Sequence, residues 1–364
     1  MRFVFRTDAS VLMGTGHVMR CLTLAEELIK NGDEVAFISR AHEGNLNGLI
    51  SKKAIKLFEL PQPQILELSS NKIENNNYKK MLGVSQQQDA KESKMFLREM
   101  KPDWLIVDHY GLDEIWENAM RIQVKKIMVI DDLANRNHDC DLLLDHNWFE
   151  NKNLRYRGLV PKACVKLLGP EYALLRKEFA HERQMLKPRD EEKIKRIFVF
   201  FGGSDPHGLT KMTLRTLCES EFSHLETDVV IGQNNPQKNV IKKLCLNRPL
   251  THLHIQVDNI ASIMSRADLA IATGGVNVWE RMSLNLFSLV VITANNQQST
   301  ILELHKNGFV LLLGTYKDIS STIIKNALIL KIEQNKKPIL SKLNVDGIGL
   351  SKVINTINSG LING

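Results

Sequence analysis

The segment Phe3-Val4-Phe5-Arg6-Thr7-Asp8, followed by Gly14-Thr15-Gly16-His17, decides how this sequence is interpreted. An apolar run that predicts a β-strand ends in charged side chains, and a glycine loop then leads into a helix predicted over residues 18–31. Glycines let the backbone approach a ligand closely. We expect His17 in the first helical turn, at the carboxyl end of a strand, where open α/β sheets bind ligands. An ordinary turn with a histidine near a helix cap is the alternative.

The composition is that of a globular protein, and the charge suits a small anionic ligand. The 364 residues are 43% hydrophobic and 24% charged, and this length favours two domains. The net charge is +7, but the lysines are interleaved with acids, aromatic residues make up only 6%, and no zinc finger or basic arm occurs. We therefore expect no nucleic-acid partner and a basic surface that attracts an anionic substrate.

The cysteines and the apolar runs indicate a reduced, cytoplasmic protein. Neither a disulfide framework nor a zinc site is predicted, because the five cysteines are widely spaced without a Cys-x-x-Cys pair; they are Cys21, Cys140, Cys164, Cys218 and Cys245. No signal peptide is recognised, and no apolar run approaches the roughly 20 residues of a membrane span. We expect no membrane insertion, and a monomer.

Strand and helix patterns alternate along the whole chain, which predicts an α/β protein with doubly wound, largely parallel sheets. We place two domains at residues 1–186 and 187–364, joined by the charged segment 187–193, and expect Asp89 to cap a helix that runs to Met100. A last helix over 348–361 can pack back on the first domain. Strands are predicted at 2–6, 34–39, 104–107, 127–130, 142–144, 197–201, 227–231, 254–257, 269–272, 286–292 and 309–312.

Two glycine turns in the second half can hold phosphate groups. The strand 197–201 runs into Gly202-Gly203-Ser204-Asp205-Pro206, and the strand 269–272 runs into Thr273-Gly274-Gly275-Val276-Asn277-Val278-Trp279-Glu280. Exposed N–H groups at such turns bind phosphates, and Glu280 can accept hydrogen bonds from ribose hydroxyls. An ordinary βα turn explains the first, and a capping box of Asn277 and Glu280 explains the second. Neither is a Rossmann or Walker motif.

Polar side chains end two further strands. Asn295-Asn296-Gln297-Gln298 places amides, which suit sugar hydroxyls and acetamido groups, after the strand 286–292. Asp108-His109-Tyr110-Gly111 follows the strand 104–107, where an acid and a phenol can orient His17 or a substrate. A polar loop and structural hydrogen bonding explain these two segments equally well.

Taken in order, these motifs resemble the UDP-2,4-diacetamido-2,4,6-trideoxy-β-L-altropyranose hydrolases of pseudaminic acid biosynthesis. The resemblance covers residues 3 to about 298, and one departure is that Val276-Asn277 stands where hydroxyl residues are common in relatives. It is carried by Phe5-Arg6-Thr7-Asp8-Ala9-Ser10, Gly14-Thr15-Gly16-His17-Val18-Met19-Arg20-Cys21-Leu22, Leu82-Gly83-Val84-Ser85, Val107-Asp108-His109-Tyr110-Gly111, Gly169-Pro170-Glu171-Tyr172-Ala173-Leu174-Leu175-Arg176, Phe201-Gly202-Gly203-Ser204-Asp205-Pro206 and Gly274-Gly275 with Trp279-Glu280-Arg281.

The resemblance implies a GT-B-like fold with two Rossmann-like domains whose parallel sheets face a cleft, and UDP held by the C-terminal domain. It implies inverting, metal-independent attack of water at the anomeric carbon without a cofactor. His17 is then the base and Glu280 the ribose ligand. The expected substrate-binding residues are Arg6, Asp8, Gly14, Gly16, Asp108, Tyr110, Asn296 and Gln297; those for UDP are Gly202, Gly203, Ser204, Gly274, Gly275, Val276, Asn277 and Glu280.

Two other functions fit the same motifs. A GT-B glycosyltransferase that uses a UDP-amino sugar would need an acceptor, and a non-catalytic nucleotide-sugar-binding protein would bind UDP without releasing it from the sugar. For the hydrolase a single base is sufficient, because UDP is a good leaving group and one neutral imidazole can activate water.

Overall fold

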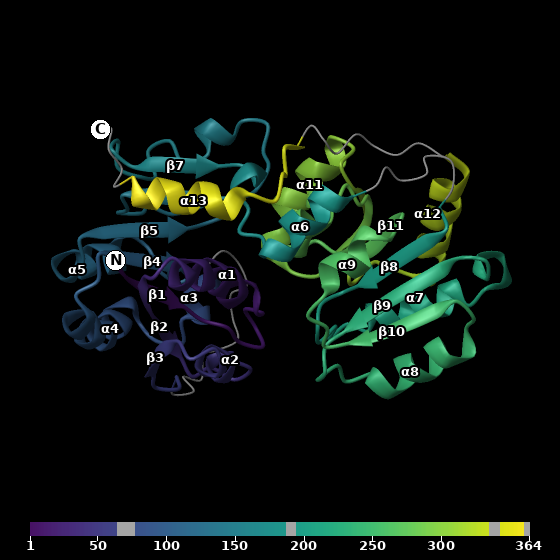
Figure 1. Cartoon of the computed structure of the whole chain (residues 1–364), viewed down its shortest axis with the longest axis horizontal. Coiled ribbons are helices and arrows are strands. Elements are labelled where there is room, and N and C mark those ends of the chain that lie inside the picture. The colour runs from purple at the N-terminus through teal and green to yellow at the C-terminus, as the bar shows by residue number, and fades with distance from the viewer. Residues whose placement is uncertain (64–76, 187–193, 335–342, 360–364) are drawn as a thin grey trace. The chain divides into compact units, whose positions relative to one another are not determined.

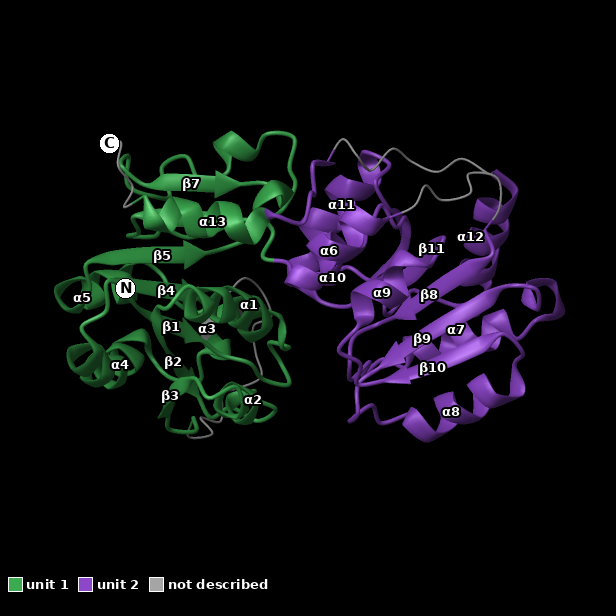
Figure 2. Ribbon diagram, in the orientation of Figure 1, with its two compact units in different colours: residues 1–174, 349–364 green, residues 175–348 purple. Residues whose placement is uncertain are grey.

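The computed structural model describes residues 1–63, 77–186, 194–334 and 343–359. The chain divides into two compact units, which Figure 2 shows in different colours. The first comprises Met1–Leu174 and Gly349–Gly364, and the second comprises Leu175–Ile348. Their junction at residue 174 precedes the boundary we placed at 186. The expected linker, 187–193, lies outside the described residues.

The first unit contains a parallel sheet of seven strands in the order β3-β2-β1-β4-β5-β6-β7. Two of them, β3 and β7, lie at the edges and were not predicted, because they are short and only partly buried. The strands are β1 (Arg2–Thr7), β2 (Glu34–Arg40), β3 (Lys56–Leu60), β4 (Trp104–Asp108), β5 (Lys126–Ile130), β6 (Leu142–Asp145) and β7 (Val165–Leu168).

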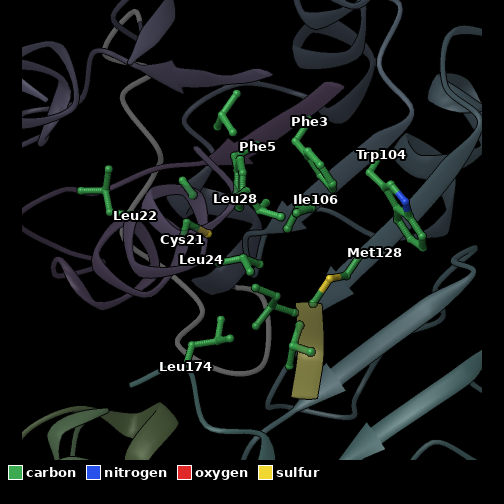
Figure 3. Packing of buried hydrophobic residues seen from close by; sticks show 14 of the residues in the cluster. Phe3, Phe5, Cys21, Leu22, Leu24, Leu28, Trp104, Ile106, Met128 and Leu174 are labelled. Carbon is green, nitrogen blue, oxygen red and sulfur yellow. The ribbon is translucent and has the colours of Figure 1, made fainter. Parts of the chain in front are cut away.

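Helices cover both faces of this sheet, so neighbouring residues of one strand enter different cores. In β1, Phe3 and Phe5 belong to one apolar cluster and Val4 to the other. Figure 3 shows the first cluster, in which Phe3, Phe5 and Trp104 pack near Leu28. The helices of the unit are α1 (Gly16–Lys30), α2 (Asn47–Lys52), α3 (Asn77–Met81), α4 (Gln86–Met100), α5 (Glu114–Met120) and α13 (Gly349–Asn358).

Helix α13 belongs to the first unit although it comes from the far end of the chain (Figure 1). Its apolar residues Leu350, Val353, Ile354 and Ile357 are buried in the same cluster as Phe3 and Phe5. Gly349 is required there, because a Cβ at this position would lie 2.6 Å from the carbonyl oxygen of Ala173. The first unit is therefore built from two segments that are distant in sequence.

The second unit contains a parallel sheet of six strands in the order β10-β9-β8-β11-β12-β13. They are β8 (Arg196–Phe200), β9 (Glu226–Ile231), β10 (Thr251–Ile255), β11 (Leu269–Thr273), β12 (Ser288–Ile292) and β13 (Leu311–Thr315). The helices are α6 (Lys177–Met185), α7 (Leu209–Leu217), α8 (Lys238–Asn247), α9 (Ile260–Ser265), α10 (Asn277–Ser283), α11 (Gln298–Lys306) and α12 (Ser321–Gln334).

The prediction of β10 was wrong by three residues. It was placed at 254–257, but the strand is Thr251–Ile255. Leu250 and Gln256 have φ values of 56° and 52°, and these left-handed residues bound the strand. β10 is a half-exposed edge strand that begins with the polar residues Thr251 and His252, so its first residues do not match the apolar pattern of a buried strand.

Candidate active site

The side chain of His17 lies where the sequence placed it, in the first turn of α1 after strand β1. The loop between them is held by a hydrogen bond from the Gly14 amide to the Ser10 carbonyl, 2.8 Å, with Gly14 in a left-handed conformation. His17 is only 4% exposed, and its Nδ1 lies 2.6 Å from Oδ1 of Asp108, the last residue of β4.

The Asp108 carboxylate determines which imidazole nitrogen of His17 is basic. Burial alone would raise the pKa of Asp108, but the Arg20 guanidinium and His17 hold it well below its usual range. An ionised carboxylate only accepts hydrogen bonds. His17 Nδ1 therefore carries the proton and donates a hydrogen bond to Asp108. Nε2 is then the basic nitrogen, and no described residue forms a hydrogen bond with it.

Arg20, one turn after His17 on α1, holds the same carboxylate from the other side. Its Nε donates to Asp108 Oδ2 and its Nη2 to Asp108 Oδ1, both at 2.6 Å. Its Nη1 reaches Asp132 Oδ2 at 3.0 Å, beyond the end of β5. Sequence reasoning missed Arg20 as a site residue, although its spacing of three from His17 predicts a shared helix face.

One tyrosine packs against the His17 ring, and a second packs behind the first. Tyr110, expected here, packs edge-on against it with ring centroids 4.4 Å apart. Tyr78, in α3, packs in turn against Tyr110 at 5.1 Å. Tyr78 was not predicted as a site residue, because it follows the polar run Glu74-Asn75-Asn76-Asn77 and no predicted strand leads to it.

Arg6 and Asp8, expected to bind substrate, are fully buried and paired with each other. Arg6 also donates to Asp89 at 3.0 and 2.6 Å. Asp8 lies 3.3 Å from His109 Nε2, and His109 Nδ1 accepts a hydrogen bond from the Gly111 amide. This arrangement supports the loop that carries Tyr110.

Asp89 does not cap helix α4, contrary to the prediction. Ser85 does so, because its hydroxyl accepts a hydrogen bond from the Gln88 amide at 3.1 Å. Asp89 lies inside the helix, where Arg6 and Arg40 neutralise its buried carboxylate. A helix-starting acid and an internal buried acid have the same local sequence pattern, and only the distant arginines distinguish them.

The ends of strands β5 and β6 add further buried ionisable groups. The Tyr156 hydroxyl lies 3.0 Å from Asp131 Oδ2 and 3.1 Å from Asp145 Oδ2. Burial raises the pKa of Asp145 to about 7. Burial, followed by the nearby Arg20 cation, lowers the pKa of His146 to about 4. Of these groups, His146 lies beside Arg20, with its Nε2 3.5 Å from Arg20 Nη1.

In the second unit, the turn after β8 exposes Gly203, whereas the side chain of Asp205 caps the start of the next helix. Gly203 and Ser204 are exposed, and the Gly203 carbonyl accepts a hydrogen bond from the Gly232 amide. The Asp205 carboxylate accepts from the amides of Leu209 and Thr210 at 3.0 and 2.7 Å. Helix α7 therefore begins at Leu209 with its first amides occupied, and Gly203 and Ser204 are exposed before it.

The turn after β11 is closely packed around Gly274. A Cβ at Gly274 would lie 2.5 Å from Ile301 Cγ1, whereas one at Gly275 would meet only Gln297 at 3.7 Å. The capping box considered for this turn does not form. Asn277 instead accepts a hydrogen bond from Arg281, and Glu280 from Arg176 Nη2 at 3.2 Å.

The predicted amide loop lies beside this turn. Asn295–Gln297 forms a short 3-10 helix after β12, and Gln297 Oε1 accepts a hydrogen bond from the Thr293 amide at 3.0 Å. The same oxygen lies 3.3 Å from the position a Gly274 Cβ would occupy. Gln297 therefore supports the glycine turn, and Asn296 beside it is half-buried.

Both sets of residues lie where a doubly wound sheet changes direction. In the first sheet the chain switches sides between β1 and β4. His17 lies in the helix that follows β1, and Asp108 is the last residue of β4. In the second it switches between β8 and β11, whose ends carry the two glycine turns. Ligands of open α/β sheets bind at such switch points. The described residues contain no group of three or more metal-ligating side chains, and none of the described helices meets the length and apolarity of a membrane span.

Comparison with known proteins confirms the resemblance drawn from the motifs, although no family model matches. UDP-2,4-diacetamido-2,4,6-trideoxy-β-L-altropyranose hydrolase of Campylobacter jejuni is 29% identical over 310 residues, which is 85% of this chain and 98% of that protein. The chain is a sequence relative of this hydrolase. An uncharacterized protein of Methanocaldococcus jannaschii is 29% identical over 82% of the chain and 57% of its own length. The spore coat polysaccharide biosynthesis protein SpsG of Bacillus subtilis is 27% identical over 40% of the chain and 43% of its own length.

Solved structures confirm the GT-B-like fold of two Rossmann-like domains. MurG of Acinetobacter baumannii superimposes with a TM-score of 0.61 at 15% identity, over 99% of this chain and all of that one. UDP-GlcNAc 2-epimerase of Neisseria meningitidis does so with a TM-score of 0.57 at 15% identity, over 98% and 99%. The Streptomyces glycosyltransferase SsfS6 gives 0.60 at 12% identity, over 98% and 99%. At these identities the likeness shows the fold alone.

Proposed function

We propose that this protein hydrolyses UDP-2,4-diacetamido-2,4,6-trideoxy-β-L-altropyranose to UDP and the free 2,4-diacetamido-2,4,6-trideoxy-L-altrose. The relative in Campylobacter jejuni carries this name and matches 85% of the chain. The observation that carries the proposal is the His17–Asp108 pair, which holds a basic nitrogen at the switch point of the first sheet.

The proposed reaction is a single displacement with inversion. His17 Nε2 removes a proton from a water molecule whose oxygen attacks the anomeric carbon. The bond from that carbon to the diphosphate oxygen breaks, and its electron pair leaves with UDP. A positioned base of this kind contributes about 10²–10⁴-fold to the rate. Asp108 keeps the imidazole in the required tautomer and stabilises the imidazolium that forms.

In this proposal the second unit holds UDP. Backbone amides of Gly202, Gly203 and Ser204 and of the turn Gly274-Gly275-Val276-Asn277 face the diphosphate, because their glycines permit close approach. Glu280 accepts hydrogen bonds from the ribose hydroxyls, and its contact with Arg176 fixes its position.

Sugar contacts are proposed for Gly14, Gly16, Tyr110, Asn296 and Gln297. Arg6 and Asp8 support them from inside the first unit. Asp108, expected to bind substrate, is fully buried against His17 and Arg20 and acts through His17. We further propose a cytoplasmic monomer that acts in pseudaminic acid biosynthesis without a metal ion or cofactor.

The test is NMR of the purified protein with this UDP-sugar and EDTA, without an acceptor, beside a His17→Ala variant. We expect release of UDP and free sugar by the wild type and loss of at least about 10²-fold in the variant. Near-normal turnover by His17→Ala would disprove the role of the base. Binding of UDP without release from the sugar would disprove the hydrolase, and candidate acceptors would then distinguish a glycosyltransferase from a binding protein.

A further inference from the structure

The guanidinium of Arg281 is fully buried beneath the Gly274–Asn277 turn of the second unit. Its Nη2 donates to the carbonyl of Thr273, the last residue of β11, at 2.9 Å. Its Nη1 donates to Asn277 Oδ1 at 2.9 Å, and its Nε to Ser288 Oγ at 2.8 Å. The side chain therefore joins both ends of the turn to the start of β12.

None of these partners is negatively charged. Among the described residues, no carboxylate lies within ion-pairing distance of Arg281, and its neighbour Glu280 pairs with Arg176 instead. A guanidinium has five N–H donors, and three hydrogen bonds are formed here. A buried cation without a directly paired counter-charge is costly. Burial lowers the pKa of Arg281 to about 9, although the nearby charge of Glu280 acts in the opposite direction.

Arg248 shows how the same unit stabilises a buried arginine that has no ligand nearby. It too lacks a carboxylate partner among the described residues, but the carbonyls of Leu217, Phe222 and Leu225 and the hydroxyls of Thr227 and Thr251 accept from it. Thr227 and Thr251 lie at the amino ends of β9 and β10, far along the strands from the glycine turns. Arg281 has one carbonyl and two side-chain oxygens, so its charge is less well compensated.

We propose that Arg281 is a positioning residue whose buried charge is neutralised by the diphosphate of a nucleotide bound at the Gly274–Asn277 turn. The guanidinium fixes the conformation of the turn through its hydrogen bonds to Thr273 and Asn277. From its buried position it attracts the anion electrostatically. This inference rests on the proposed binding of UDP at that turn. The selectivity for a diphosphate over an uncharged nucleoside then comes from Arg281, on the inner side of the turn.

Calorimetric titration of the full chain with UDP and with uridine tests the proposal. Arg281→Met, which removes the charge but keeps much of the length, is expected to weaken UDP binding about tenfold or more while uridine binding stays nearly unchanged. Arg281→Lys, which keeps the charge, should retain most of the UDP affinity. Arg248→Met is the matched control, and we expect it to lower the melting temperature without changing the preference for UDP over uridine.

Four outcomes overturn the inference. Equal weakening of UDP and uridine in Arg281→Met would mean that the residue only maintains the fold, and so would an Arg281→Lys variant as weak as Arg281→Met. Unchanged UDP binding in a folded Arg281→Met would mean that the charge has no part. Wild-type protein that binds UDP but hydrolyses no UDP-sugar would disprove the hydrolase and leave this inference standing, whereas no UDP binding at all would disprove both.

Discussion

The carboxyl edges of the two sheets have the same topology but opposite chemistry. The edge of the first sheet is made of charged and polar side chains that pair with one another, with His17, Arg20 and Asp108 at its centre. The edge of the second is made of glycine turns, backbone amides and hydroxyls, with the charge of Arg281 beneath the surface. In the proposed function, one doubly wound fold supports proton transfer in one unit and binding of an anion in the other.

In the proposed reaction the two edges meet different requirements. Proton transfer depends on one tautomer of one ring, so the first edge fixes His17 through a carboxylate that is itself held twice by Arg20. Close approach of a phosphate depends on space, so the second edge depends on residues without side chains. Substitutions should therefore affect rate at the first edge and affinity at the second.

The largest expected effect is loss of turnover in Asp108→Asn. An asparagine presents one acceptor and one NH2 group, which cannot accept from both His17 and the two Arg20 donors, so the basic nitrogen of His17 is no longer fixed at Nε2. We expect kcat to fall about 10³-fold, with the affinity for UDP unchanged, as measured by UDP release and by titration.

Asp132→Asn is the matched control for this experiment, because Asp132 pairs with Arg20 at 3.0 Å but has no contact with His17. It should keep most of the activity. If both variants lost turnover equally, the contribution of Asp108 would lie in the overall charge of the edge and not in the tautomer of His17.

A smaller effect is expected at the glycine turn of the second edge. Gly274→Ala places a methyl group 2.5 Å from Ile301 Cγ1, whereas Gly275→Ala makes only an ordinary contact at 3.7 Å. We expect Gly274→Ala to cost about 1–3 kcal/mol of unfolding free energy. Gly275→Ala should be nearly as stable as the wild type but bind UDP more weakly. Chemical denaturation and titration with UDP measure the two effects, and a stable Gly275→Ala with full UDP affinity would contradict a diphosphate at this turn.

The smallest effect is a pair of opposing pH dependences at the first edge. The pKa of buried Asp145 is raised to about 7, so between pH 4 and 7 the folded state holds a proton that the unfolded state loses, and stability falls as pH rises. The pKa of His146 is lowered to about 4, so below pH 6.5 the unfolded state binds the extra proton, and stability rises with pH. The two contributions oppose each other over pH 4–6.5.

Single variants should separate these contributions in melting temperatures measured from pH 4.5 to 7. Relative to wild type, Asp145→Asn should gain a few degrees as pH rises, and His146→Gln should lose a few degrees. Parallel curves for all three proteins would show that neither group has a shifted pKa in the folded state.

The strands and turns around the site were predicted better from the sequence than the buried ion pairs beneath them. His17 and Asp108 were found because each follows an apolar run, and the ends of parallel strands meet at one edge. Arg6 and Asp8 were expected to bind substrate, and charged residues are rarely buried unless they are paired. Only the structure shows that Asp89 and Arg40 join them in a buried network.

The remaining errors come from contacts that are distant along the chain. The edge strands β3 and β7 are short and only partly buried, and β10 alternates polar and apolar residues. Tyr78 and Arg20 have roles that depend on neighbours in other elements. Periodicity within one element contains no information about these neighbours.

The return of helix α13 to the first unit has a consequence for synthesis on the ribosome. The core that contains Phe3 and Phe5 remains open on one side until Leu350, Val353, Ile354 and Ile357 have been made. All described elements of the second unit emerge before that point. The nascent chain therefore carries an exposed apolar stripe on its first-made sheet throughout the synthesis of the later unit, a stripe that chaperones would recognise. The unit that begins first is completed last.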